Sequence, residues 1–160
     1  DEIKGIELAG ALKNIYAIIS GYCHSLDVGE NAIGLILTRS MAEMSNFAVN
    51  KGANPITFLG LAGMGDLVAT CFSKLSRNYQ FGWAIGEGLD IEAAKYKVGQ
   101  VAEGLNTIRI IHNEISSSKI KMPLVSGMHE ILFNSGSKEL LLEQIINSDI
   151  YVDVNFDVES

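Results

Sequence analysis

The sequence is poor in proline, cysteine and positive charge, and each shortage excludes a class of protein. Its 160 residues contain only two prolines, Pro55 and Pro123, so little in the chain interrupts regular structure. The two cysteines, Cys23 and Cys71, form no Cys-x-x-Cys pair and lie in apolar surroundings, which favours buried free thiols over a disulfide framework. We therefore expect a cytoplasmic protein that is held together by its hydrophobic core.

Excess negative charge and the lack of long apolar runs limit the partners. The formal net charge of −7 repels phosphate backbones, so the sequence disfavours nucleic-acid binding, and any phosphate ligand must be held by a local group of residues. No segment approaches the ~20 consecutive apolar residues that a membrane span needs. A hydrophobic fraction of 48% and a charged fraction of 19% instead indicate one globular domain.

Apolar residues recur at three- and four-residue spacing through most of the chain, which is the period of helices. The pattern predicts an all-α fold with a single multi-helix domain over residues 1–148. We expect helices over about residues 5–26, 31–50 and 101–117, and others that begin near residues 55, 66, 76–78, 90, 123 and 137. Residues 149–160 form an acidic tail whose alternating apolar and polar residues indicate a short strand or a frayed end.

Lys13 is the first candidate for chemistry because it lies on an unusually apolar helix. From Gly5 to Cys23 the only other charged residue is Glu7, and a helix that is apolar nearly all round is a buried one. A buried lysine without a partner is costly to keep charged, a condition that suits proton transfer near neutral pH. The small residues Gly10 and Ala17 leave room beside Lys13 for a ligand. The alternative is a lysine whose methylene stem carries its charge to the surface.

A second candidate is the glycine-rich run Gly-Leu-Ala-Gly-Met-Gly-Asp, from Gly60 to Asp66. Closely spaced glycines permit positive φ and a close approach of the backbone to a ligand. The spacing is not the Gly-x-Gly-x-x-Gly fingerprint of dinucleotide binding, and the run follows a helical pattern rather than a strand. Asp66 is either a helix N-cap or a catalytic carboxylate, and one use does not exclude the other.

Ser76, Arg77 and Asn78 form a third candidate at a predicted helix start. An arginine fork beside hydroxyl and amide side chains and unpaired backbone N–H groups binds anions well. The alternative uses Ser76 or Asn78 as the helix cap and leaves Arg77 as a surface charge. The motif alone leaves both interpretations open.

Histidines offer no complete metal-binding motif. His129-Glu130 is followed by Phe133 at the position where a zinc helix of the His-Glu-x-x-His type needs its second histidine. His24 and His112 show no partner pattern in the sequence and are expected to be structural. We therefore expect no metal site.

Several segments, taken together, resemble the C-terminal domain of bacterial-type, NAD(P)-dependent glycerol-3-phosphate dehydrogenases. The residues of these segments match that family, and so do the order and spacing of the segments. The resemblance extends from about residue 5 to residue 123 and into the helix that follows. The segments are Gly-Ala-Leu-Lys-Asn at 10–14, Thr-Arg at 38–39, Ala-Glu-Met at 42–44, Gly-Leu-Ala-Gly-Met-Gly-Asp-Leu at 60–67, Ser-Arg-Asn at 76–78 and Val-Ala-Glu-Gly at 101–104.

The resemblance implies a fold of the 6-phosphogluconate dehydrogenase C-terminal-like type and an oxidoreductase activity. The implied reaction interconverts dihydroxyacetone phosphate and sn-glycerol 3-phosphate with NAD or NADP, for glycerophospholipid synthesis. The roles implied by the family are catalysis for Lys13 and Asp66, substrate binding for Asn14, Ser76, Arg77 and Asn78, and cofactor binding for Arg77, Val101 and Glu103.

The family also places an N-terminal Rossmann domain, which holds most of the NAD or NADP, before a domain of this kind. The present chain contains neither alternating strands nor the glycine fingerprint, and it starts abruptly at Asp1. We therefore expect a piece of a longer enzyme that is inactive alone, with its choice between NAD and NADP made elsewhere. Two alternatives stay open: the corresponding domain of a related hydroxy-acid dehydrogenase, and a non-catalytic helical dimerisation module. A homodimer is compatible with each of them.

Overall fold

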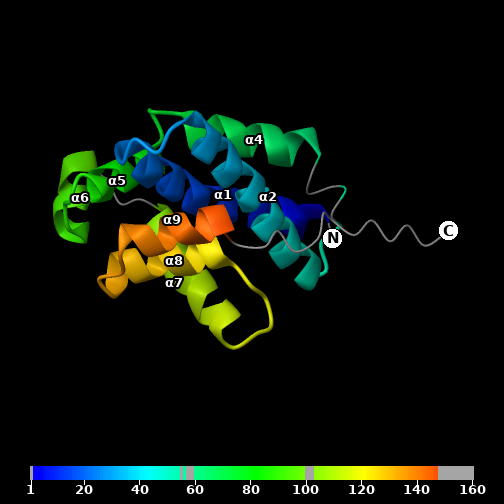
Figure 1. Cartoon of the computed structure of the whole chain (residues 1–160). Helices are drawn as coiled ribbons and strands as arrows, with labels where there is room; N and C mark the ends of the chain where they lie inside the picture. The colour runs from blue at the N-terminus through cyan, green and yellow to red at the C-terminus, as the bar shows by residue number, and fades with distance from the viewer. Residues whose placement is uncertain (1, 55, 57–59, 100–102, 148–160) are drawn as a thin grey trace.

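The computed structural model describes residues 2–54, 56, 60–99 and 103–147, and the regular structure of these residues is entirely helical (Figure 1). The all-α prediction is confirmed. The helix predicted from Pro55 and the tail predicted at residues 149–160 lie outside the described residues. The described helices are α1 (Glu2–Ser25), α2 (Glu30–Asn50), α4 (Leu61–Phe72), α5 (Arg77–Gly86), α6 (Ile91–Val98), α7 (Glu103–Ser116), α8 (Pro123–Phe133) and α9 (Lys138–Asn147).

Local interactions within one turn account for the starts of α6, α8 and α9. The Asp90 carboxylate accepts a 2.8 Å hydrogen bond from the Ala93 N–H and caps α6. The Ser137 hydroxyl accepts one of 3.2 Å from the Leu140 N–H at the start of α9. Pro123 occupies the first turn of α8, where its missing N–H leaves no bond unmade. These starts are confirmed as predicted.

The start of α4 is different from the prediction. Asp66 does not cap this helix, which begins at Leu61 with Gly60 as its N-cap, so Asp66 lies in the second turn. The glycine-rich run is itself helical rather than a loop of positive φ, and the Gly60 carbonyl accepts hydrogen bonds from the N–H groups of Gly63 and Met64. Each glycine lowers helix propensity by about 1 kcal/mol relative to alanine. The burial of Leu67 against the core outweighs that cost.

Helix α1 lies at the centre of the fold and contacts α2, α4, α5, α7 and α8. Figure 1 shows it between α4 on one side and the layer of α7 and α8 on the other. The sequence predicted this burial from the apolar character of the helix, and the side chains from Ile15 to Ile19 are fully buried. None of the helices in the described part of the chain is long and apolar enough to cross a membrane.

The two cysteines are buried free thiols, as predicted. Cys23 lies on α1 and Cys71 on α4, and both belong to the hydrophobic core. Burial raises the pKa of each thiol to about 12. Because the thiolate is the reactive form of cysteine, these groups behave as small apolar side chains.

Helices α1 and α5 approach each other closely because glycine occupies both sides of their crossing. A Cβ atom at Gly21 of α1 would overlap the Tyr79 carbonyl oxygen, and one at Gly82 of α5 would overlap the Ile18 carbonyl oxygen. In both cases the obstacle is backbone of the facing helix, which cannot rotate away as a side chain can. The crossing therefore requires glycine at both positions.

Replacing Gly82 by alanine tests this contact. We expect Gly82→Ala to lower the free energy of unfolding by about 2 kcal/mol or more, because the added methyl group forces α5 away from α1. The free energy is measured by urea denaturation followed by circular dichroism. The control is Gly34→Ala on α2, where no described atom outside the glycine's own helix and chain neighbours lies within 4 Å of an added Cβ. That control should keep its stability or gain about 0.5–1 kcal/mol. Equal stability of the two variants would contradict the proposed crossing.

Candidate active site

Lys13 and Asp66 come together from helices that are far apart in the sequence. The Lys13 ammonium on α1 donates a hydrogen bond of 2.5 Å to the Asp66 carboxylate on α4. The side chains keep 27% and 52% of their surfaces exposed, so the pair is open to a solute. Lys13 is therefore partly exposed and paired, rather than fully buried. The packing of α4 on α1 supplies the partner.

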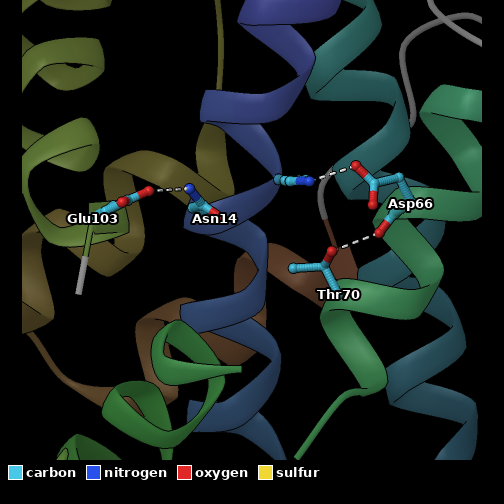
Figure 2. A network of polar contacts seen from close by, with 5 residues as sticks. Asn14, Asp66, Thr70 and Glu103 are labelled. Carbon is cyan, nitrogen blue, oxygen red and sulfur yellow. Dashed lines mark hydrogen bonds and ion pairs between the residues drawn. The ribbon is translucent and has the colours of Figure 1, made fainter. Parts of the chain in front are cut away.

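Asn14, the next residue on α1, reaches a different helix. Its amide Nδ2 donates a 3.5 Å hydrogen bond to the carboxylate of Glu103, the first residue of α7. Figure 2 shows Glu103 on one side of α1 and Asp66 on the other. Successive residues of an α-helix point about 100° apart, so neighbouring side chains of α1 contact separate helices. The polar groups of α1 thus connect α4 with the start of α7.

Asn78 joins α5 to the same helix start. The side chain is buried, and its Oδ1 accepts a 2.9 Å hydrogen bond from the backbone N–H of Gly104. Gly104 also lies against α1, because an added Cβ would come within 2.7 Å of the Asn14 carbonyl oxygen. The two N–H donors of the Asn78 amide are not used in the bond to Gly104. Asn14, Asn78, Glu103 and Gly104 therefore meet where α7 begins.

Ser76 and Arg77 occupy the start of α5. The Ser76 hydroxyl accepts a 3.4 Å hydrogen bond from the Tyr79 N–H, so Ser76 is the helix cap that the sequence allowed. Arg77 is the first residue of the helix and is exposed. Arg77 therefore stands at the positive end of α5, where backbone N–H groups are unpaired, a combination that suits an anion. The substrate- and cofactor-binding roles of Arg77 stay predictions, and Val101 lies outside the described residues.

Glu43 is a buried acid to which the sequence analysis assigned no role. It lies on α2, and its two carboxylate oxygens accept hydrogen bonds from the Tyr16 hydroxyl at 3.0 Å and from the Leu124 N–H at 2.6 Å. Burial raises the pKa of Glu43 to about 8, although the hydrogen bonds from Leu124 and Tyr16 and the charge of Arg39 oppose this shift. Tyr16 lies one turn after Lys13, so Glu43 ties the helix that carries Lys13 to the first turn of α8.

Comparisons with known proteins find relatives that share one name. A family model described as NAD-dependent glycerol-3-phosphate dehydrogenase C-terminus matches residues 2–143. A protein of Pseudomonas savastanoi pv. phaseolicola named glycerol-3-phosphate dehydrogenase (NAD(P)+) is 50% identical over 152 residues, which cover 95% of this chain and 45% of that protein. A relative of the same name from Pseudomonas fluorescens SBW25 is 49% identical over 152 residues, which again cover 95% of this chain and 45% of the relative. The chain therefore spans about half the length of the curated relatives it matches.

Solved structures show the same correspondence. The crystal structure of glycerol-3-phosphate dehydrogenase from Coxiella burnetii has a TM-score of 0.84 and 38% sequence identity to this chain, and the match covers 89% of this chain and 44% of that one. The corresponding yeast enzyme from Saccharomyces cerevisiae has a TM-score of 0.78 at 28% identity, with 89% of this chain and 42% of that one covered.

The buried position of Glu43 predicts a pH-dependent stability. An acid whose pKa is raised from 4.5 to about 8 on folding holds its proton more tightly in the folded state. Its contribution to stability is therefore present below pH 4.5 and is lost as the pH rises toward 8. Between pH 5 and pH 8, we expect the free energy of unfolding to fall by about 1.4 kcal/mol per pH unit on account of Glu43.

Chemical denaturation at several pH values measures this slope. The variant Glu43→Gln keeps the shape of the side chain without its ionisation, so its slope over this range should be shallower than that of the parent chain. The variant Glu143→Gln removes an exposed carboxylate on α9 and should keep the parent slope. Identical slopes in all three proteins would show that Glu43 does not titrate as proposed.

Proposed function

The chain belongs to the family of NAD-dependent glycerol-3-phosphate dehydrogenase C-terminal domains, and from this premise we propose that it is the substrate-binding and catalytic part of such an enzyme. The proposed reaction is the reversible reduction of dihydroxyacetone phosphate to sn-glycerol 3-phosphate, which serves glycerophospholipid synthesis. The observation that carries this proposal is the open ion pair between Lys13 and Asp66 at 2.5 Å.

In the proposed reaction, Lys13 moves the proton that the reaction requires. NAD(P)H, when bound, supplies the hydride that adds to the carbonyl carbon of the substrate. As the hydride adds, negative charge develops on the carbonyl oxygen, and the Lys13 ammonium stabilises that charge and donates a proton to it. In the reverse direction, neutral Lys13 accepts the proton of the substrate hydroxyl. Asp66 accepts a hydrogen bond from Lys13 and thereby fixes the direction in which the ammonium points.

The start of α5 is suited to the phosphate of the substrate. Arg77 offers a planar fork of N–H donors that can hold two phosphate oxygens, and the N-terminus of the helix adds its partial positive charge. Asn78 of the same helix and Asn14 of α1 bring amide donors, and the bond of Asn78 to Gly104 keeps the Asn78 side chain in place. A phosphate held at one end positions the carbonyl at the other for reaction with Lys13.

The described residues fit only part of a dinucleotide site. They contain no strand and no Gly-x-Gly-x-x-Gly run, so they lack the unit that binds the pyrophosphate of NAD or NADP. Arg77 and Glu103 lie at the starts of α5 and α7, where they would face a cofactor held by an N-terminal Rossmann domain. A non-catalytic dimerisation module would have no need for an exposed lysine–aspartate pair at this place.

Two substitutions separate the proposed roles in a full-length dehydrogenase that carries this domain. Lys13→Met removes the transferable proton and the charge that faces the developing alkoxide, so kcat should fall by about 10²–10⁴-fold or more. Arg77→Lys keeps a charge but loses the planar fork, so the main effect should be a higher KM for dihydroxyacetone phosphate. Steady-state kinetics with NADH or NADPH measure both constants.

A matched control for these variants is Lys119→Met, which removes an exposed lysine beyond the end of α7 and should leave both constants unchanged. If Lys13→Met kept kcat within a few-fold of the parent enzyme, the proton-transfer role would have to be withdrawn. An unchanged KM in Arg77→Lys would likewise remove Arg77 from the phosphate site.

The 160-residue chain on its own should show no dehydrogenase turnover. The described part of the chain contains no unit that holds the nicotinamide against the substrate, and the reaction depends on that positioning. The measurement is the absorbance of NADH or NADPH in the presence of dihydroxyacetone phosphate and the purified chain. Oxidation of either cofactor above the rate of a Lys13→Met control would contradict the prediction.

A further inference from the structure

Two histidines that the sequence keeps apart meet on the side of the domain formed by α7 and α8. His112 lies on α7, and His129 and Glu130 lie on α8. The imidazole rings of His112 and His129 stack with their centroids 3.6 Å apart and an angle of 6° between the ring planes. The potential ligand atoms of His112, His129 and Glu130 all lie within 4.8 Å of one another. These residues belong to no part of the proposed active site.

One nitrogen of this group has no hydrogen-bond partner among the described residues. The Nδ1 atom of His129 is buried, and the nearest carboxylate oxygen, on Glu130, lies 3.9 Å away, beyond hydrogen-bond length. A buried nitrogen without a partner is costly, and such groups are rare in folded proteins. Ring stacking accounts for the parallel planes of the two imidazoles, but it does not satisfy this nitrogen.

The surroundings of the Glu130 carboxylate also suit a metal. The Glu130 carboxylate accepts hydrogen bonds of 3.0 and 3.1 Å from the Asn134 amide, which hold it in orientation. Metal-binding carboxylates usually have such supporting partners.

We propose that His112, His129 and Glu130 form a binding site for a divalent transition-metal ion, of which Zn²⁺ fits the ligands best. Two imidazole nitrogens and one carboxylate oxygen are a donor set that zinc prefers, with a fourth position left for water. Ligand atoms around a tetrahedral zinc lie roughly 3.4 Å apart, so the group must contract slightly from its 4.8 Å span.

Binding also requires the two imidazole rings to change their relative orientation. Imidazole lone pairs lie in the ring plane, so the stacked rings must tilt for both nitrogens to face one ion. The ion would then connect α7 to α8, because each helix supplies at least one ligand. The cation on these helices is Arg109, whose guanidinium lies 4.6 Å from the centroid of the Phe133 ring. Its positive charge weakens the binding of a cation, so we expect moderate affinity.

Zinc titration of the metal-free chain tests the proposal. After treatment with a chelator and its removal, isothermal titration with ZnCl2 should show one ion per chain with a dissociation constant in the micromolar range or below. The same ion should raise the melting temperature by several degrees, because it binds the folded state and joins two helices. MgCl2 should produce neither effect, because Mg²⁺ prefers oxygen ligands.

Three variants test whether the ion binds at this site, and a fourth serves as a matched control. His112→Gln, His129→Gln and Glu130→Gln should each weaken zinc binding at least ten-fold, and Glu130→Gln changes the shape of the side chain least. His24→Gln removes the remaining histidine, which lies on α1 beside Phe72 and Tyr79, and should leave zinc binding unchanged. Circular dichroism checks that each variant is folded. The proposal is overturned if the parent chain binds no zinc at millimolar concentration, or if folded His112→Gln and His129→Gln bind it as tightly as the parent.

Discussion

The backbone contact between α1 and α5 is the constraint on which the rest of this structure depends. Glycine at both sides of the crossing lets the helices approach until each meets the carbonyl groups of the other. This close approach places the start of α5 beside the start of α7, where Asn78 binds the Gly104 N–H. A larger residue at Gly21 or Gly82 would push α1 and α5 apart. It would thereby also separate Lys13 on α1 from the proposed phosphate-binding residues at the start of α5.

Helix α1 is buried over most of its described length, and several of its polar side chains bond to groups on other helices. Lys13 pairs with Asp66 of α4, Asn14 with Glu103 of α7, and Tyr16 with Glu43 of α2. The bond of Tyr16 to Glu43 is buried, and because a buried polar group without a partner is costly, it fixes the rotation of α1 about its own axis. The fold and the candidate site therefore rest on the same interactions: the bonds that orient α1 also orient Lys13.

The sequence correctly predicted the helix starts that depend on local interactions. Asp90 and Ser137 start helices where caps were expected, and Pro123 opens α8, because a cap depends only on residues within one helical turn. The exception is Asp66, which had a plausible local role as a cap. Burial of α4 against the core extended that helix through the glycine run and moved Asp66 into its second turn. Tertiary packing there outweighed the local preference of glycine.

The sequence by itself determined the helical class, most helix starts, the buried state of α1 and the family to which the chain belongs. Only the tertiary structure decided which charged and polar groups meet. Lys13 and Asp66 are 53 positions apart, and Asn14 and Glu103 are 89 apart. Neither pair has a local signature, because the approach of two helices depends on the shapes of the surfaces they bury. The same reason explains why His112 and His129 looked unrelated until α7 packed against α8.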